Sequence, residues 1–195
     1  NISEVNFYTQ NNGTLKLLCA TGIDKPYSTR QDDDINFNFK IHLPKDSAAV
    51  FYLNTKSIHP IELPLLLNNA VTKNRFIMIQ TTAMSIYVGI LLSVLLYNLF
   101  LFFSIKDPSY VTYVLFLLLL LFAQLTYAGW SFKFLWLDNP AINHYAVPIT
   151  SSLPGIPALL FALFFLHIKR YSKLLFKLYI ALIGIYLLIP LFCFF

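Results

Sequence analysis

The sequence predicts an integral membrane protein in which an all-β portion precedes a bundle of transmembrane α-helices. Its 195 residues are 57% hydrophobic and 12% charged, whereas soluble domains are about 45–50% apolar and about 25% charged. Four apolar stretches after residue 75 each reach the roughly 18 residues needed to cross a hydrocarbon core about 30 Å thick. Residues 1–70 show instead the two-residue alternation typical of strands.

The β portion, residues 1–70, contains one strong strand pattern and several weaker ones. In INFNFKIHL, residues 35–43, apolar and polar side chains alternate strictly, as in a strand with one buried face. Several short strands at this spacing predict a β-sandwich. Five strands are few for a sandwich, so we expect more of this domain to precede residue 1. The weaker strand patterns cover residues 5–9, 15–20, 50–55 and 61–67.

The transmembrane region is expected at residues 76–195, after a short polar connector at residues 71–75. Because the connector leaves little slack, movement of the β portion should be passed to the first helix. The chain stops within an apolar stretch, so we expect it to be an internal piece of a longer protein. The predicted helices cover about residues 76–105, 108–130, 146–167 and 174–195.

Basic residues in the short connections predict the orientation. Lys106 lies in the first connection and Lys169, Arg170 and Lys173 lie in the third, whereas the second contains only Lys133. Cytoplasmic loops are enriched in lysine and arginine, so the first and third connections should be cytoplasmic and the β portion should lie outside. The net charge of +5 therefore reflects topology, and we expect no binding of nucleic acid.

The first connection is predicted to be a tight turn made by Lys106, Asp107 and Pro108. Asp107 can cap the second helix, and Pro108 suits its first position, where the missing N–H costs nothing. We therefore expect the first two helices to form an antiparallel hairpin.

Two carboxamides, Asn98 and Gln124, interrupt the apolar helices. Each should seek a partner on a neighbouring helix, a contact worth roughly 0.6–2 kcal/mol. The alternatives are a role in a signalling switch and exposure at the membrane interface.

The second connection, GWSFKFLWLDNP, is aromatic and includes Trp130 and Trp136. Such rings are typical of the belt at a membrane interface. Alternatively, they form a docking surface for the β portion or for a ligand.

Three prolines weaken the third helix. Pro154, Gly155 and Pro157 follow Pro148, and prolines interrupt the helical hydrogen-bond ladder, so its outer half should be kinked or partly unwound. The break is either a packing irregularity, or a hinge or the lining of a ligand cavity.

No catalytic or metal-binding pattern is present. The chain lacks the phosphate-binding loop, the dinucleotide-binding glycines, the nucleophile elbow and the HExxH zinc motif, so we expect no cofactor, metal or catalysis from this sequence. Asp32-Asp33-Asp34 lacks the spacing of a calcium loop and is expected to be a solvated turn. No charged residue lies deep in a predicted helix, which disfavours an ion-coupled transporter.

Residues 85–140 resemble a known family. GILLSVLLYNLFLFFSIKDPSYVTYVLF, followed by AGWSFKFLWLDNP, is similar to the membrane region of the bacterial seven-transmembrane receptors with diverse intracellular signalling modules. Residues 1–70, with TGIDKPYSTR and FNFKIHLPKDSAAVFYLNTKS, resemble the later strands of that family's extracellular sensor, a jelly-roll similar to carbohydrate-binding modules.

The resemblance implies a receptor of the bacterial inner membrane with three further helices and a periplasmic β domain. It would bind a small ligand, for which a carbohydrate is a candidate, and signal to a cytoplasmic module such as a histidine kinase, a diguanylate cyclase or a phosphatase. The alternative functions are a transporter or a membrane-bound enzyme with an accessory β domain, and a plain membrane anchor.

Overall fold

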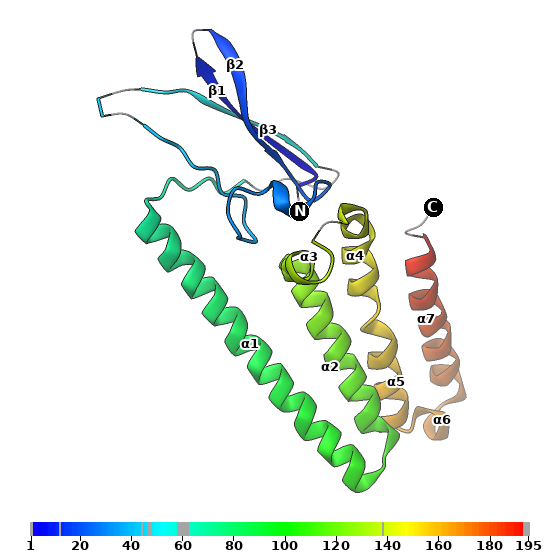
Figure 1. The fold of residues 1–195 in the computed structure, drawn as a ribbon. Coiled ribbons are helices and arrows are strands. Elements are labelled where there is room, and N and C mark those ends of the chain that lie inside the picture. Colours follow the sequence, from blue (N-terminus) through cyan, green and yellow to red (C-terminus); the bar gives the residue numbers. More distant parts are fainter. Residues whose placement is uncertain are drawn as a thin grey trace. The chain divides into compact units, whose positions relative to one another are not determined.

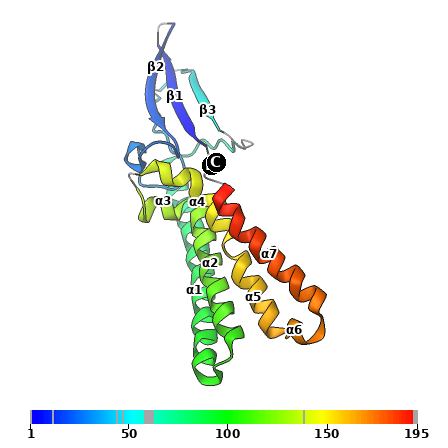
Figure 2. The ribbon, with the colours of Figure 1, turned by 90° about the vertical axis from the view of Figure 1, so that its right-hand side faces the viewer.

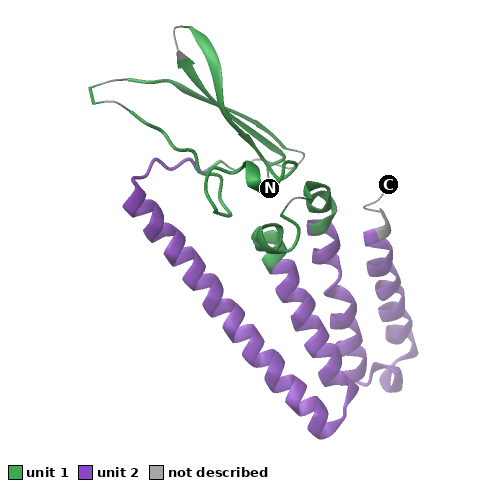
Figure 3. Cartoon of the chain, in the orientation of Figure 1, with its two compact units in different colours: residues 1–63, 125–146 green, residues 64–124, 147–195 purple. Residues whose placement is uncertain are grey.

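The computed structural model describes residues 2–11, 13–43, 45–46, 48–57, 63–137 and 139–192 (Figure 1). The chain divides into two compact units (Figure 3). Unit 1 comprises residues 1–63 and 125–146, and unit 2 comprises residues 64–124 and 147–195. The first unit therefore combines the N-terminal β portion with residues from the second connection between membrane helices.

A three-stranded antiparallel sheet forms the centre of unit 1. Its strands are β1 (Glu4–Asn11), β2 (Thr14–Thr21) and β3 (Phe51–Lys56), in the order β2-β1-β3 (Figure 2). The β1–β2 hairpin turns at Gly13, whose φ of 81° is a conformation that glycine adopts without steric cost.

One face of the sheet is covered by the segment between β2 and β3. Val5 and Phe7 of β1 are buried, and Phe7 stacks on Phe39 with ring centroids 4.7 Å apart and on Phe51 at 5.4 Å. On the opposite face, Tyr52 is exposed. The alternation along β1 thus gives the sheet one packed face and one open face.

The strand predicted at residues 35–43 is wrong, because these residues form no regular secondary structure. Local side chains take up the backbone groups that a ladder would need. The carboxylate of Asp34 accepts hydrogen bonds from the backbone N–H of Asn36 (3.1 Å) and from Nδ2 of Asn38 (2.5 Å). Asparagine and aspartate commonly compete with strands in this way, and the apolar side chain of Phe39 packs on the sheet without joining it.

The weaker strand patterns predicted strands more accurately than the strong pattern did. Residues 5–9 and 15–20 lie within β1 and β2, and residues 51–55 of the predicted 50–55 lie within β3. Of the pattern at 61–67, residues 61 and 62 lie outside the described residues, and residues 63–67 form no strand. The described β portion is therefore a small sheet, and the jelly-roll stays a prediction.

Four helical crossings follow in the part of the chain that the structure describes, as predicted. They are α1 (Ala70–Ile105), α2 (Pro108–Tyr127), α4 (Pro140–Ser152) with α5 (Gly155–Phe165), and α7 (Lys173–Phe192). Each crossing is long and apolar enough to span a membrane. The described residues also form three short helices: the 3-10 helix η1 (Tyr27–Thr29), α3 (Trp130–Phe134) and α6 (Ile168–Tyr171).

Helix α1 is longer than a membrane requires. At a rise of 1.5 Å per residue, its 36 residues span about 54 Å, whereas the hydrocarbon core is about 30 Å thick. The helix begins at Ala70, and the side chain of Asn69 caps it by accepting a hydrogen bond from Thr72 N at 2.8 Å. The residues expected to be a connector, 71–75, are therefore helical.

Candidate coupling interface

Two stretches distant in sequence meet within unit 1. The first, residues 23–38, follows β2 and is called the docking segment. The second, residues 129–137 and 139–143, contains α3 and the start of α4 and is called the platform. Tyr27 is central to their contact: its backbone N–H donates to Leu137 O at 2.8 Å, and its buried ring meets the Phe132 ring edge-on, with centroids 5.5 Å apart.

Arg30 lies in an aromatic cage formed by both stretches. Its guanidinium carbon is 4.6 Å from the ring centroids of Tyr27 and Phe37, and 5.6 Å from that of Phe132. Nη1 of Arg30 also donates to the carbonyls of Asp34 and Ile35, at 2.8 and 2.6 Å. Burial lowers the pKa of Arg30, but an arginine stays protonated in proteins, so the cage holds a cation.

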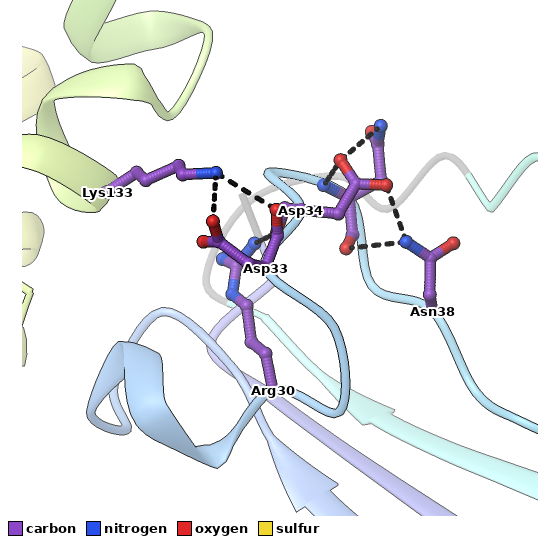
Figure 4. Close-up of polar contacts among 6 residues, drawn as sticks. Arg30, Asp33, Asp34, Asn38 and Lys133 are labelled. Carbon is purple, nitrogen blue, oxygen red and sulfur yellow. Dashed lines mark hydrogen bonds and ion pairs between the residues drawn. The ribbon is translucent and has the colours of Figure 1, made fainter. Parts of the chain in front are cut away.

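An ion pair joins the docking segment directly to α3. Nζ of Lys133 is 2.9 Å from Oδ2 of Asp33 and also donates to the backbone carbonyl of Asp33 at 2.9 Å (Figure 4). The side chain of Lys133 is only 17% exposed, whereas that of Asp33 is 78% exposed. Water therefore has free access to the acidic partner, which keeps the strength of such a pair modest.

The three consecutive aspartates have three different environments. Asp32 forms an ion pair with Lys40 at 2.7 Å, Asp33 pairs with Lys133, and Asp34 is buried. The expectation of a solvated turn is therefore wrong for Asp34, because hydrogen bonds to its carboxylate compensate for lost hydration. Among the described residues, no group of three or more His, Cys, Asp or Glu side chains could hold a metal ion.

The platform residues predicted from sequence lie as follows. Trp136 Nε1 donates to Oδ1 of Asn143 at 2.6 Å, and Nδ2 of Asn143 donates to the carbonyl of Ile23 at 3.0 Å. Trp130 stacks on Phe134, with centroids 5.7 Å apart. Trp136 therefore reaches the docking segment through Asn143, whereas the stacking of Trp130 on Phe134 lies within the platform itself.

Two buried polar atoms at this contact lack a hydrogen-bond partner among the described residues. They are the hydroxyl oxygen of Tyr27 and Nε of Arg30. A buried polar group without a partner costs about 1–3 kcal/mol. Burial also raises the pKa of Tyr27 from 10.0 to about 12, because the charged phenolate would be poorly hydrated there.

The predicted interhelical contacts of Asn98 and Gln124 stay predictions. Nδ2 of Asn98 donates to the carbonyl of Val94, one turn earlier in α1, at 2.8 Å. Gln124 lies on an exposed part of α2. The hydrogen bond of Asn98 therefore stays within its own helix.

The turn between α1 and α2 consists of Lys106 and Asp107, and α2 begins at Pro108. Lys106 adopts a left-handed conformation with φ 56°, and Oδ1 of Asp107 accepts a hydrogen bond from Ser109 N at 2.8 Å. This hydrogen bond lowers the pKa of Asp107. A cavity of about 770 Å³ opens at the same end of unit 2, with basic residues on its wall: His167, Lys169 and Arg170.

The third crossing is interrupted where the prolines predicted a break. Helix α4 ends at Ser152 and α5 begins at Gly155, so Pro154 lies in the interruption, and Pro157 is buried in the first turn of α5. A Cβ atom at position 155 would overlap the ring of Tyr186. Glycine thus permits close packing between α5 and α7, and hinge motion here stays a prediction.

Sequence reasoning did not assign Tyr27, Arg30 or Asp33 to an interface, although the aromatic connection that contains Phe132 was one candidate docking surface for the β portion. A partial signal existed in Lys133, the single basic residue of the second connection. Nothing in the local sequence pairs it with Asp33, 100 residues earlier.

The N-terminal β domain and the four apolar crossings define a multi-pass membrane protein with an extracellular N-terminal domain. Residues 80–195 match the family model described as 7TM diverse intracellular signalling, and residues 1–69 match that of 7TMR-DISM extracellular 2. The chain belongs to this family, and it is therefore a transmembrane sensory receptor. No curated protein and no solved structure matches it.

Proposed function

We propose that this receptor binds a small extracellular ligand, with carbohydrates as the leading candidates, and relays binding to a cytoplasmic signalling module. We place it in the bacterial inner membrane, with the β domain in the periplasm. The observation that supports a relay is that residues of the sensory domain and of the second connection belong to one compact unit. A ligand that moves the domain would then act on the ends of membrane helices.

The proposed mechanism is a shift between two populations. A ligand favours one arrangement of the β domain, and it can shift the equilibrium only by its differential affinity for the two states. The shift passes to α1, which starts at Ala70 directly after the capping residue Asn69. Movement of α1 and α2 relative to the third crossing would then alter the cytoplasmic side.

Thermal unfolding of the full-length receptor in lipid nanodiscs tests ligand binding. The panel consists of glucose, galactose, maltose, cellobiose and trehalose, with amino acids as a second chemical class. A ligand at 100 times its Kd stabilises the folded state by about 2.7 kcal/mol, so one sugar should raise Tm in a concentration-dependent manner. A response to amino acids alone would reject the carbohydrate assignment.

The rival function, transport, predicts movement of the solute. Receptor reconstituted in proteoliposomes should take up no more radiolabelled sugar than empty liposomes. Saturable uptake of a sugar that also raises Tm would favour the transporter and contradict the receptor mechanism.

A further inference from the structure

We propose that the contact between the docking segment and the platform is a reversible latch, whose release changes the state of the membrane helices. The inference rests on the proposed receptor function and adds to it a second, non-covalent route of coupling. The covalent route enters the membrane through α1, whereas the latch acts on the ends of α2 and α4.

The platform is tied closely to both of these helices. Only two residues separate the end of α2 from the start of α3, and the buried hydroxyls of Thr126 and Ser131 are hydrogen-bonded at 2.9 Å. Asn143, which accepts from Trp136 and donates to Ile23 O, belongs to the first turns of α4. A docking segment that holds α3 and Asn143 therefore restrains both helix ends.

The turn that precedes α3 has a specific backbone conformation, which fixes the position of α3. Gly129 caps α3 with φ 84°, a left-handed conformation that other residues adopt only at a cost. A Cβ atom at Gly129 would lie 4.0 Å from that of Ile35, so the docking segment reaches the turn itself. Movement of the docking segment should therefore displace the junction between α2 and α3.

The contact combines attraction with features that limit its strength. The ion pair between Asp33 and Lys133 has one exposed partner, and exposed pairs contribute little. The unpartnered polar atoms of Tyr27 and Arg30 oppose docking, because each could be hydrated if the segment lifted away. The balance of these terms favours a contact that opens and closes.

The two tryptophans of residues 1–195, Trp130 and Trp136, both lie in the platform, so intrinsic fluorescence reports on the platform once every tryptophan outside these residues is replaced by phenylalanine. The test uses the full-length receptor in nanodiscs and acrylamide quenching, without any ligand. Asp33→Lys and Lys133→Asp each replace attraction by repulsion and should shift the ratio of docked to open forms about threefold or more, since the pair alone accounts for a few-fold. Quenching should rise in both variants.

The double variant Asp33→Lys/Lys133→Asp restores opposite charges and should return quenching toward the parent value. This rescue also excludes simple misfolding of the single variants. The matched controls are Asp32→Lys and Lys40→Asp, because that adjacent ion pair lies within the β portion. Equal quenching in the parent and both single variants, or an equal rise in the controls, would overturn the latch.

A second readout tests whether the latch acts on the membrane helices. Ser104→Cys places an environment-sensitive fluorophore beside the turn between α1 and α2, after Cys19, Cys193 and every cysteine outside residues 1–195 are changed to Ser. The single charge reversals should shift its emission, and the double reversal should restore it. If acrylamide quenching rose in the single variants but the emission of the fluorophore at position 104 did not change, the latch would be overturned as a coupling device. The proposed function has its own test: it would fail, independently of the latch, if no compound of the ligand panel raised Tm.

Discussion

At Arg30, a buried cation is stabilised by rings and by backbone carbonyls. Two of the three rings come from the docking segment, and the third, Phe132, comes from the platform. Aromatic faces attract a cation more strongly when water is excluded. The same exclusion leaves the nearby hydroxyl of Tyr27 without a partner, so one environment stabilises the arginine and penalises the tyrosine.

This penalty predicts the effect of Tyr27→Phe. Removing a buried hydroxyl that lacks a partner should raise the free energy of unfolding of the receptor by up to about 1–3 kcal/mol. Urea unfolding followed by tryptophan fluorescence measures the change. Tyr52→Phe is the control, because its exposed hydroxyl donates to Gln10 at 2.9 Å, and it should cause no stabilisation. A clear loss of stability in Tyr27→Phe would contradict the assignment.

Alkaline pH should open the latch. The Tyr27 hydroxyl ionises near pH 10 when exposed but at about 12 in the folded protein. The folded state therefore retains the proton more strongly, and its advantage is present below pH 10 and lost as pH rises toward 12. Because other groups also lose protons in this range, the informative quantity is the difference in acrylamide quenching between the parent and Tyr27→Phe. No difference above pH 10 would refute the prediction.

Among the elements, the third crossing departs most from a regular helix. The break between α4 and α5 coincides with Leu153 and Pro154, where proline removes a donor and crowds the preceding turn. The adjacent Gly155 then leaves space for the Tyr186 ring of α7. Helix interruption and close helix packing are thus produced by neighbouring residues.

Gly155→Ala should destabilise the packing of α5 on α7. The added methyl group overlaps the Tyr186 ring, and overpacking of this kind typically costs 1–3 kcal/mol, roughly. Gly184→Ala in α7 is the matched control: its Cβ meets no atom within 4 Å, and alanine is the better helix former by about 0.8–1.0 kcal/mol. Thermal unfolding in nanodiscs should show Tm falling only for Gly155→Ala, and a fall in both would point to a general effect.

At the scale of the whole molecule, two routes lead from the sensory domain into the membrane. One is the chain itself, which enters α1 at Ala70. The other is the latch, which involves residues about 100 positions apart. Because a ligand can act through either route, the two must be separated by experiment.

A flexible Gly/Ser spacer inserted after Asn69 should uncouple ligand binding from the cytoplasmic side through the first route. A sugar that raises Tm should do so in the spacer variant as well, but the emission shift at position 104 should be reduced. A spacer of equal length after Gly13, in the hairpin turn, is the control. Full response in the Asn69 variant would defeat coupling through α1, whereas persistence of the Asp33→Lys effect there is expected if the latch acts independently.

The sequence by itself determined the membrane architecture of this protein. Long apolar runs have few alternatives to spanning helices, because backbone groups must be satisfied within the segment. The tight turn at Lys106 and Asp107 and the interruption at Pro154 were likewise visible, because their causes lie in adjacent residues.

Only the tertiary structure determined that residues 35–43 form no strand, and which residues make up the interface. The residues alternate as a strand would, but Asp34 and Arg30 form hydrogen bonds with local polar groups there, and no strand ladder is present. The pairing of Asp33 with Lys133 and the cage around Arg30 depend on segments far apart in the chain. Local sequence patterns cannot predict such contacts, because the contacts arise from the way the folded elements pack.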